Sequence, residues 1–193
     1  EPEVSTLSLF EETGTLAISA GTFILGEGST ITADLKGYPA YSGPGAANNA
    51  SSGAGHGGAG GQGAEGIPGP PYGSATAPTT LGSGGSQGPG GGAIRLNVWN
   101  SLTVDGIITA NGAHGSSAGG SVYITTAGFD GTGTIRANAG GGPCGACTAF
   151  NAGGAGGRVA IYYTASTFSG TVEAKGGVGN HGEPPADKQQ GTV

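Results

Sequence analysis

Apolar and polar residues alternate in the same order along four stretches of the chain. "GGRVAIYYTASTFSGTVEAKGG" (156–177) repeats the pattern of "GGSVYITTAGFDGTGTIRANAG" (119–140) and "GGAIRLNVWNSLTVDGIITANG" (91–112). A fourth copy runs from Leu16 to Ala33. Alternation with a period of two is typical of a strand that buries one face, so each copy predicts short strands separated by bends.

Placing the copies in register makes their buried positions coincide. Such repeats favour an all-β solenoid of about four rungs, in which each coil covers the apolar face of the next. The alternative is a β-sandwich of unrelated hairpins that share a generic strand pattern. The alignment places Arg136 beside Glu173 and Asn111 beside Asn138. It predicts two internal ladders: Ile31, Ile108, Ile135 and Val172, and Ala33, Ala110, Ala137 and Ala174.

Glycine fills the connections between the copies. The 193 residues include 46 glycines, and the long insertion at 38–92 holds many of them. Several are three apart, among them Gly57, Gly60 and Gly63, and three residues per turn is the repeat of the extended polyproline II helix. We expect the loops at 38–92, 113–118 and 141–155 to form a glycine-rich side layer resembling polyglycine II. The alternative, to which we give equal weight, is an irregular loop that lies on the solenoid.

The two ends of the chain differ from the repeats. We divide it into an N-terminal strand or cap (1–13), the glycine-rich solenoid (14–177) and an extended C-terminal tail (178–193). The segment "VSTLSLF" (4–10) alternates, and it either caps the first coil or adds as a strand to a neighbouring subunit. Its candidate assembly residues are Val4, Leu7, Leu9 and Phe10.

Charge and hydropathy argue against two classes of partner, nucleic acid and the membrane interior. The formal net charge is −6 with only 6 Lys and Arg residues, so no basic stripe exists to bind nucleic acid. No apolar run of membrane-spanning length occurs. The chain opens without Met or a leader and is rich in Gly, Ser and Thr, which suggests a mature secreted chain or a piece of a larger one. We expect an extracellular or cell-surface location.

Few residues are candidates for a redox or metal-binding site. Cys144 and Cys147 have redox-motif spacing, but no helical pattern follows them, so a local disulfide is favoured over a redox site. His56, His114 and His181 lie in glycine-rich connections that should leave the same corner, which makes them candidate metal ligands, but nothing in the sequence fixes the distances between them. We therefore expect no metal and no cofactor.

Acid–base catalysis needs clustered carboxylates, and these are sparse. Asp34, Asp105 and Asp130 stand near rung corners, where turns favour Asp, so we expect no catalytic residues and no enzyme. Asn49 begins an N-glycosylation sequon in the long loop. The candidate aromatic residues for contact with sugars are Tyr38, Tyr41, Tyr72, Trp99, Tyr162 and Tyr163.

The rungs of the form "GGxhxhxh…GTIxAxGG", with "YGSATAP…LGSGG" between them, resemble glycine-rich repeats of large secreted or surface proteins of bacteria and protists. This resemblance, over most of 14–177, implies a right-handed parallel β-helix at a surface and supplies no catalytic residues. The glycine-rich loops alone resemble polyglycine II layers of phage tail-fibre adhesins. We expect a self-assembling structural subunit of an extracellular filament. The alternatives are an adhesin module that binds glycans or a receptor and, third, a carbohydrate-active enzyme.

Overall fold

The computed structural model describes residues 14–64, 66–114, 116–140, 152–179 and 191–193. Within these ranges the regular structure is entirely β. The strands are β1 (Thr15–Leu25), β2 (Thr30–Thr32), β3 (Ala93–Val104), β4 (Ile107–Thr109), β5 (Ser121–Asp130), β6 (Thr134–Arg136), β7 (Arg158–Tyr162), β8 (Ala165–Ser166) and β9 (Thr171–Glu173).

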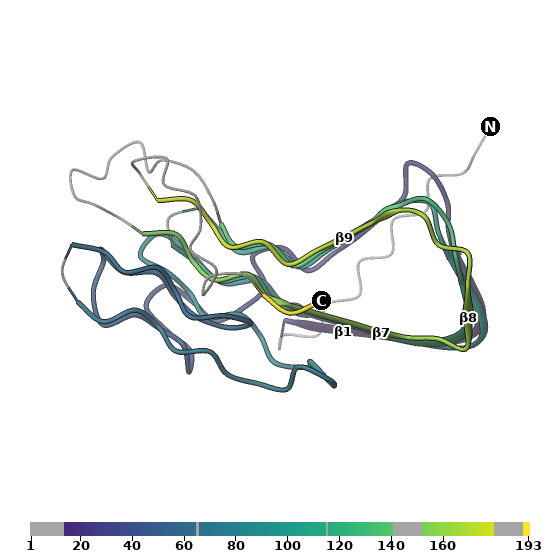
Figure 1. The fold of residues 1–193 in the computed structure, drawn as a ribbon, viewed down its shortest axis with the longest axis horizontal. Coiled ribbons are helices and arrows are strands. Elements are labelled where there is room, and N and C mark those ends of the chain that lie inside the picture. Colours follow the sequence, from purple (N-terminus) through teal and green to yellow (C-terminus); the bar gives the residue numbers. More distant parts are fainter. Residues whose placement is uncertain (1–13, 65, 115, 141–151, 180–190) are drawn as a thin grey trace.

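The strands form two parallel sheets. The first has the order β1-β3-β5-β7, with β8 beside β5, and the second has the order β2-β4-β6-β9. In each pass the chain runs along the first sheet, bends, runs along the second sheet and then leaves toward the glycine-rich connections, so that the four passes overlie one another (Figure 1). The prediction of an all-β protein is confirmed, and its sheets are parallel.

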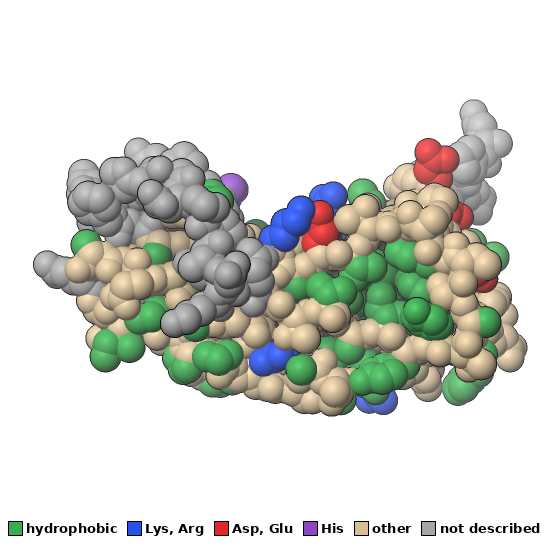
Figure 2. All heavy atoms as spheres, viewed as in Figure 1, with side chains coloured by type: hydrophobic (Ala, Val, Ile, Leu, Met, Phe, Trp, Pro, Cys, Tyr) green, Lys and Arg blue, Asp and Glu red, His purple; other side chains and the backbone are tan. Residues whose placement is uncertain are grey.

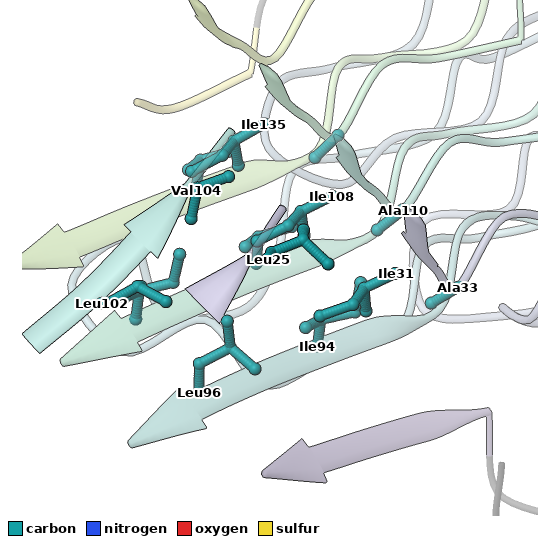
Figure 3. Packing of buried hydrophobic residues seen from close by; sticks show 14 of the residues in the cluster. Leu25, Ile31, Ala33, Ile94, Leu96, Leu102, Val104, Ile108, Ala110 and Ile135 are labelled. Carbon is teal, nitrogen blue, oxygen red and sulfur yellow. The ribbon is translucent and has the colours of Figure 1, made fainter. Parts of the chain in front are cut away.

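The register of the sheets follows the alignment of the copies. Ile31 pairs with Ile108, Ile108 with Ile135, and Ile135 with Val172. The three isoleucines are fully buried, whereas Val172 in the last strand is only partly buried. Figure 3 shows the isoleucine and alanine positions stacked between the sheets. The alanine ladder is also buried, and it consists of Ala33, Ala110, Ala137 and Ala174.

The glycine-rich connections form a hydrogen-bonded layer. In the segment 90–92, three successive amides donate to three different parts of the chain, the carbonyls of Tyr38, Ala118 and Ala33. The segment 118–120 does the same, toward the carbonyls of Ser83, Ala155 and Ala110. A β-strand directs its backbone bonds to two sides only, whereas an extended helix with three residues per turn directs successive amides about 120° apart. These segments therefore pack with neighbours on several sides.

Glycine is required here because backbones are in direct contact. A Cβ atom on Gly53 would lie 2.0 Å from the carbonyl oxygen of Gly153, and one on Gly57 would lie 2.0 Å from that of Gly157. Buried backbone groups need partners, and close approach without side chains lets these segments supply them to one another. The loops at 38–92, 113–118 and the described part of 141–155 lie together in this layer.

Candidate functional site

An apolar groove lies at the end of the molecule formed by the last pass of the chain. Its volume is about 260 Å³. Figure 2 shows hydrophobic side chains gathered in a hollow inside the turn made by β7, β8 and β9. The residues that line it are Phe129, Val159, Ile161, Tyr163, Ser166, Phe168, Val172 and Val193.

The groove is the part of the core that is left uncovered at the last described pass of the chain. In the inner passes, each buried side chain is covered by its equivalent one pass later, as Ile135 is by Val172. β7 and β9 are the final strands in their sheets, so no equivalent strand covers Ile161 or Val172 among the described residues. Phe168 stacks on Phe129 with ring centroids 4.4 Å apart and forms one wall. Among the described residues, the groove is therefore lined by core-type side chains that no further strand covers.

Residues 191–193 lie along the edge of β7, where the next strand of the first sheet would begin. Thr192 pairs in parallel with Arg158, and the amide of Val159 donates to the carbonyl of Thr192 at 2.7 Å. The amide of Gly191 donates to the carbonyl of Ala174, as that of Gly157 donates to Ala137 one pass earlier. "Gly-Thr-Val" thus stands where each copy of the repeat begins. The sequence pattern, which indicates an extended tail over 178–193, gives no sign of this contact.

A buried arginine fixes the corner where this fifth strand begins. Arg158 is 7% exposed, and its Nη1 donates to Thr192 Oγ1 at 3.0 Å. Its Nε and Nη2 donate to the carbonyl of Tyr72, and Nη2 also reaches the carbonyl of His56. Burial lowers the pKa of Arg158. Sequence analysis missed this residue, although a charged side chain where the other copies have Thr15, Ala93 and Ser121 was a signal.

His56 lies beside this corner and is fully buried. Its Nδ1 lies 2.7 Å from the carbonyl oxygen of Gly119, which only accepts, so Nδ1 carries the proton and Nε2 accepts from the Thr80 hydroxyl at 2.9 Å. Burial, opposed by contacts with the backbone of Gly119 and Gly120 and assisted by the charge of Arg158, lowers the pKa of His56 to about 4. Both ring nitrogens are thus engaged in structural bonds.

Of the three candidate histidines, the described residues include His56 and His114. His114 is exposed, and His181 lies outside the described residues. Within the described ranges no group of three His, Cys, Asp or Glu side chains is placed to hold a metal ion.

The three corner carboxylates bind the next pass of the chain. Asp34 accepts the backbone amide of Asn111 at 2.6 Å, and Asp105 accepts that of Thr132 at 3.0 Å. Asp130 accepts the hydroxyl of Thr167. Each is therefore held in a structural contact between equivalent turns.

The first of these contacts continues as a ladder. The amide of Asn138 donates to Asn111 Oδ1, and that of Lys175 donates to Asn138 Oδ1. Beside it, Arg136 Nε lies 3.4 Å from Glu173 Oε2, the neighbour that the alignment predicts. A hydrogen bond from Lys175, assisted by one from Asn138, lowers the pKa of Glu173.

The candidate glycan contacts are dispersed. Asn49 is half-buried, and its Oδ1 accepts from the amides of Ser51 and Ser52, so its side chain holds a turn; glycosylation there stays a prediction. Tyr72 is also structural, since its hydroxyl donates to the carbonyl of Leu81. Tyr38 is half-buried. The exposed aromatic side chains are Tyr41, Trp99, Tyr162 and Tyr163.

Two groups of predicted residues lie outside the described ranges. They are the disulfide candidates Cys144 and Cys147, and the assembly residues Val4, Leu7, Leu9 and Phe10. Across the described residues, no helix is long and apolar enough to cross a membrane. A comparison of the chain with protein-family models, with curated proteins and with solved structures finds no match.

Proposed function

We propose that the chain is a structural subunit of an extracellular filament and that it assembles with copies of itself through the open ends of its sheets. In this proposal the four passes are the rungs of a short right-handed parallel β-helix. The glycine-rich connections form a polyglycine II-like layer along its side. The right hand follows the strong preference of parallel crossover connections.

The observation that carries the proposal is the groove over Ile161, Phe168 and Val172. It exposes core-type side chains together with the final strands of two parallel sheets. An unprotected strand edge next to apolar surface recruits further strands. The natural occupant is a second copy of this chain, because the repeat offers strands of matching length and pattern.

The opposite end has a related surface. Among the described residues β1 pairs only with β3, and Ile18 and Phe23, which pack against the core from β1, are only partly buried. The two ends carry different residues, so contact between the end of one copy and a different surface of another is heterologous. Heterologous contacts that do not close into a ring produce open filaments. The fold thus supports polymer growth in one direction.

An adhesin is the second candidate. On the first sheet, the guanidinium of Arg95 lies 5.7 Å from the centre of the Tyr123 ring, and Tyr123 meets Tyr162 edge to face at 6.1 Å. Tyr162 is exposed, and aromatic rings beside a guanidinium suit stacking on a sugar ring. This strip favours glycan binding as an alternative or additional role.

Electron microscopy and sedimentation of the purified chain test the proposal. The wild-type chain should form fibres. Ile161→Asp, which places a charge in the groove, should leave discrete particles. Tyr162→Asp, the next residue of β7 with its more exposed side chain, is the matched control and should still form fibres. Circular dichroism verifies that both variants fold.

Discrete wild-type particles at every concentration would contradict the filament proposal. Binding of those particles to a glycan array, lost in Tyr123→Ala, would favour the adhesin. Fibres formed equally well by Ile161→Asp would show that the groove is not the contact.

A further inference from the structure

We propose that the outer face of the first sheet binds an acidic glycan, with the carboxylate of a uronic acid on Arg95 and a neutral neighbouring sugar on Tyr162. This inference rests on the adhesin role, the second candidate function, and names the class of glycan that it would bind. It is independent of filament growth, because it concerns the face of the sheet and not its edges.

Three side chains form a diagonal strip on this face. Arg95 on β3 and Tyr123 on β5 are paired in the register of the sheet, and both point away from the core, since the residues on either side of each are buried apolar residues. Tyr162 on β7 pairs with Thr125, which lies two residues after Tyr123 and therefore on the same face. The strip thus crosses three adjacent strands and joins one positive charge to two aromatic rings.

The charge of Arg95 is available to an anion. Its side chain is exposed, and its guanidinium lies 5.7 Å from the centre of the Tyr123 ring. Among the described residues Arg95 makes no ion pair, whereas Arg136 and Lys175 both contact Glu173. A guanidinium presents two parallel N–H groups that match the two oxygens of a carboxylate. An acid group on the ligand would supply the partner that the described part of the chain does not.

Tyr162 presents an apolar surface that is already held in place. It is 47% exposed, and its hydroxyl donates to the carbonyl of Thr76 at 2.9 Å. A ring that is fixed before binding loses little conformational entropy when a sugar stacks on it. The Tyr123 ring lies between Tyr162 and Arg95, 6.1 Å from the Tyr162 ring and 5.7 Å from the guanidinium. The two outer groups are therefore separated by no more than about the length of a disaccharide.

Polar groups suited to sugar hydroxyls adjoin the strip. Thr125 Oγ1 donates to Asn97 Oδ1 at 2.8 Å, which leaves the side-chain N–H groups of Asn97 to donate to a ligand. The loop that Tyr162 contacts carries the exposed residues Ser74 and Thr76, whose hydroxyls both donate and accept. Aromatic, cationic and hydroxyl-bearing groups therefore meet on one surface.

The strip is an open shelf with a single charge. On β1, Ala17 pairs with Arg95 and Ser19 with Asn97, and both of these small residues are exposed, so they raise no wall beside the strip. An open shelf accepts the interior of a polysaccharide as well as its end. Dense polyanions such as nucleic acids need many cations, whereas one arginine on a chain of net charge −6 matches one carboxylate. The strip therefore favours a glycan in which uronic acids are separated by neutral sugars.

Fluorescence anisotropy with labelled hexasaccharides and the complete chain tests the inference. The probes are fragments of hyaluronan and of glucuronoxylan, each as the free acid and as the methyl ester, which keeps the sugars and removes the charge. We expect saturable binding of at least one acid. Its ester should bind roughly ten-fold more weakly, which is the loss expected for one hydrogen-bonded ion pair.

Variants of the chain locate the binding. Arg95→Gln should bind the acid roughly ten-fold more weakly and the ester as the wild type does, and Arg95→Lys should restore only part of the loss. Arg136→Gln is the matched control, because Arg136 is also exposed but pairs with Glu173 on the second sheet, and it should bind as the wild type does. Tyr162→Ala should weaken the binding of acid and ester alike. Circular dichroism verifies that the variants fold.

Equal binding of acid and ester, or unchanged binding of the acid by Arg95→Gln, would overturn the carboxylate site and leave the adhesin with a neutral glycan. Absence of binding to every probe would overturn the inference and would remove the support that this strip gives to an adhesin. Fibre formation by the wild-type chain decides the filament proposal separately in each case.

Discussion

Replacement of Gly53 by Ala tests the packing of the glycine-rich layer most directly. The added Cβ would lie 2.0 Å from the Gly153 carbonyl oxygen and 2.8 Å from the Gly61 nitrogen. Ordinary contact begins near 3.4 Å, so two segments must separate by roughly 1.4 Å. The amide of Gly61 donates to the Gly153 carbonyl at 2.9 Å, and that bond lies in the path of the movement.

The expected cost follows from these contacts. Overpacking of a filled interior costs about 1–3 kcal/mol, and each weakened buried hydrogen bond costs about 1 kcal/mol more. Ala also restricts the unfolded chain, which returns about 0.4–1 kcal/mol. We therefore expect Gly53→Ala to lower the free energy of unfolding by about 1–4 kcal/mol.

The assay is equilibrium urea unfolding followed by circular dichroism, at a concentration at which the chain sediments as a monomer. Gly26→Ala is the matched control, because a Cβ there meets no atom within 4 Å and its φ lies outside the left-handed region. We expect it to be neutral or slightly stabilising. If Gly53→Ala is as stable as Gly26→Ala, residues 53, 61 and 153 do not meet as described and the layer is not close-packed.

Two further predictions concern the buried histidine and the open groove. The pKa of His56 is about 4 in the folded chain and 6.5 in the unfolded chain. The free energy of unfolding should therefore be at its full value above pH 6.5 and decrease as the pH falls toward 4. Urea titrations should show a loss of about 2 kcal/mol at pH 5. This pH-dependent loss should be absent in His56→Gln and unchanged in His114→Gln, where the histidine is exposed. Val122→Ala, at a fully buried site, should cost about 2–3 kcal/mol, against about 1 kcal/mol for Val172→Ala at the groove, because only the first leaves a closed cavity. Equal losses for the two valine variants in the monomer would contradict an open groove.

Much of the sheet structure is readable from the sequence, because strand pattern and register are local or repeated properties. Alternation shows which face of a strand is buried, and equivalent residues of successive copies must pair if the copies stack. Ile31, Ile108 and Ile135 are neighbours in the structure for this reason. The contact between Arg136 and Glu173 follows from the same alignment.

The surroundings of the loop residues are set only by the tertiary structure. Nothing local distinguishes His56 from His114, since both follow glycine-rich residues, yet one is fully buried and the other is exposed. Arg158 is held by carbonyls of residues 56 and 72, far away in the chain. Glycine spacing shows that backbones can approach closely, but it does not show which ones.

The sequence by itself determined the strands, their buried faces and their pairing, because each depends on a short pattern that recurs along the chain. The tertiary structure alone decided which backbones of the glycine-rich layer meet, where the buried charge lies and where the core stays open. Those features depend on contacts between segments about one hundred residues apart, as between Gly53 and Gly153, and on how the described passes stack. Short-range patterns carry no information about either.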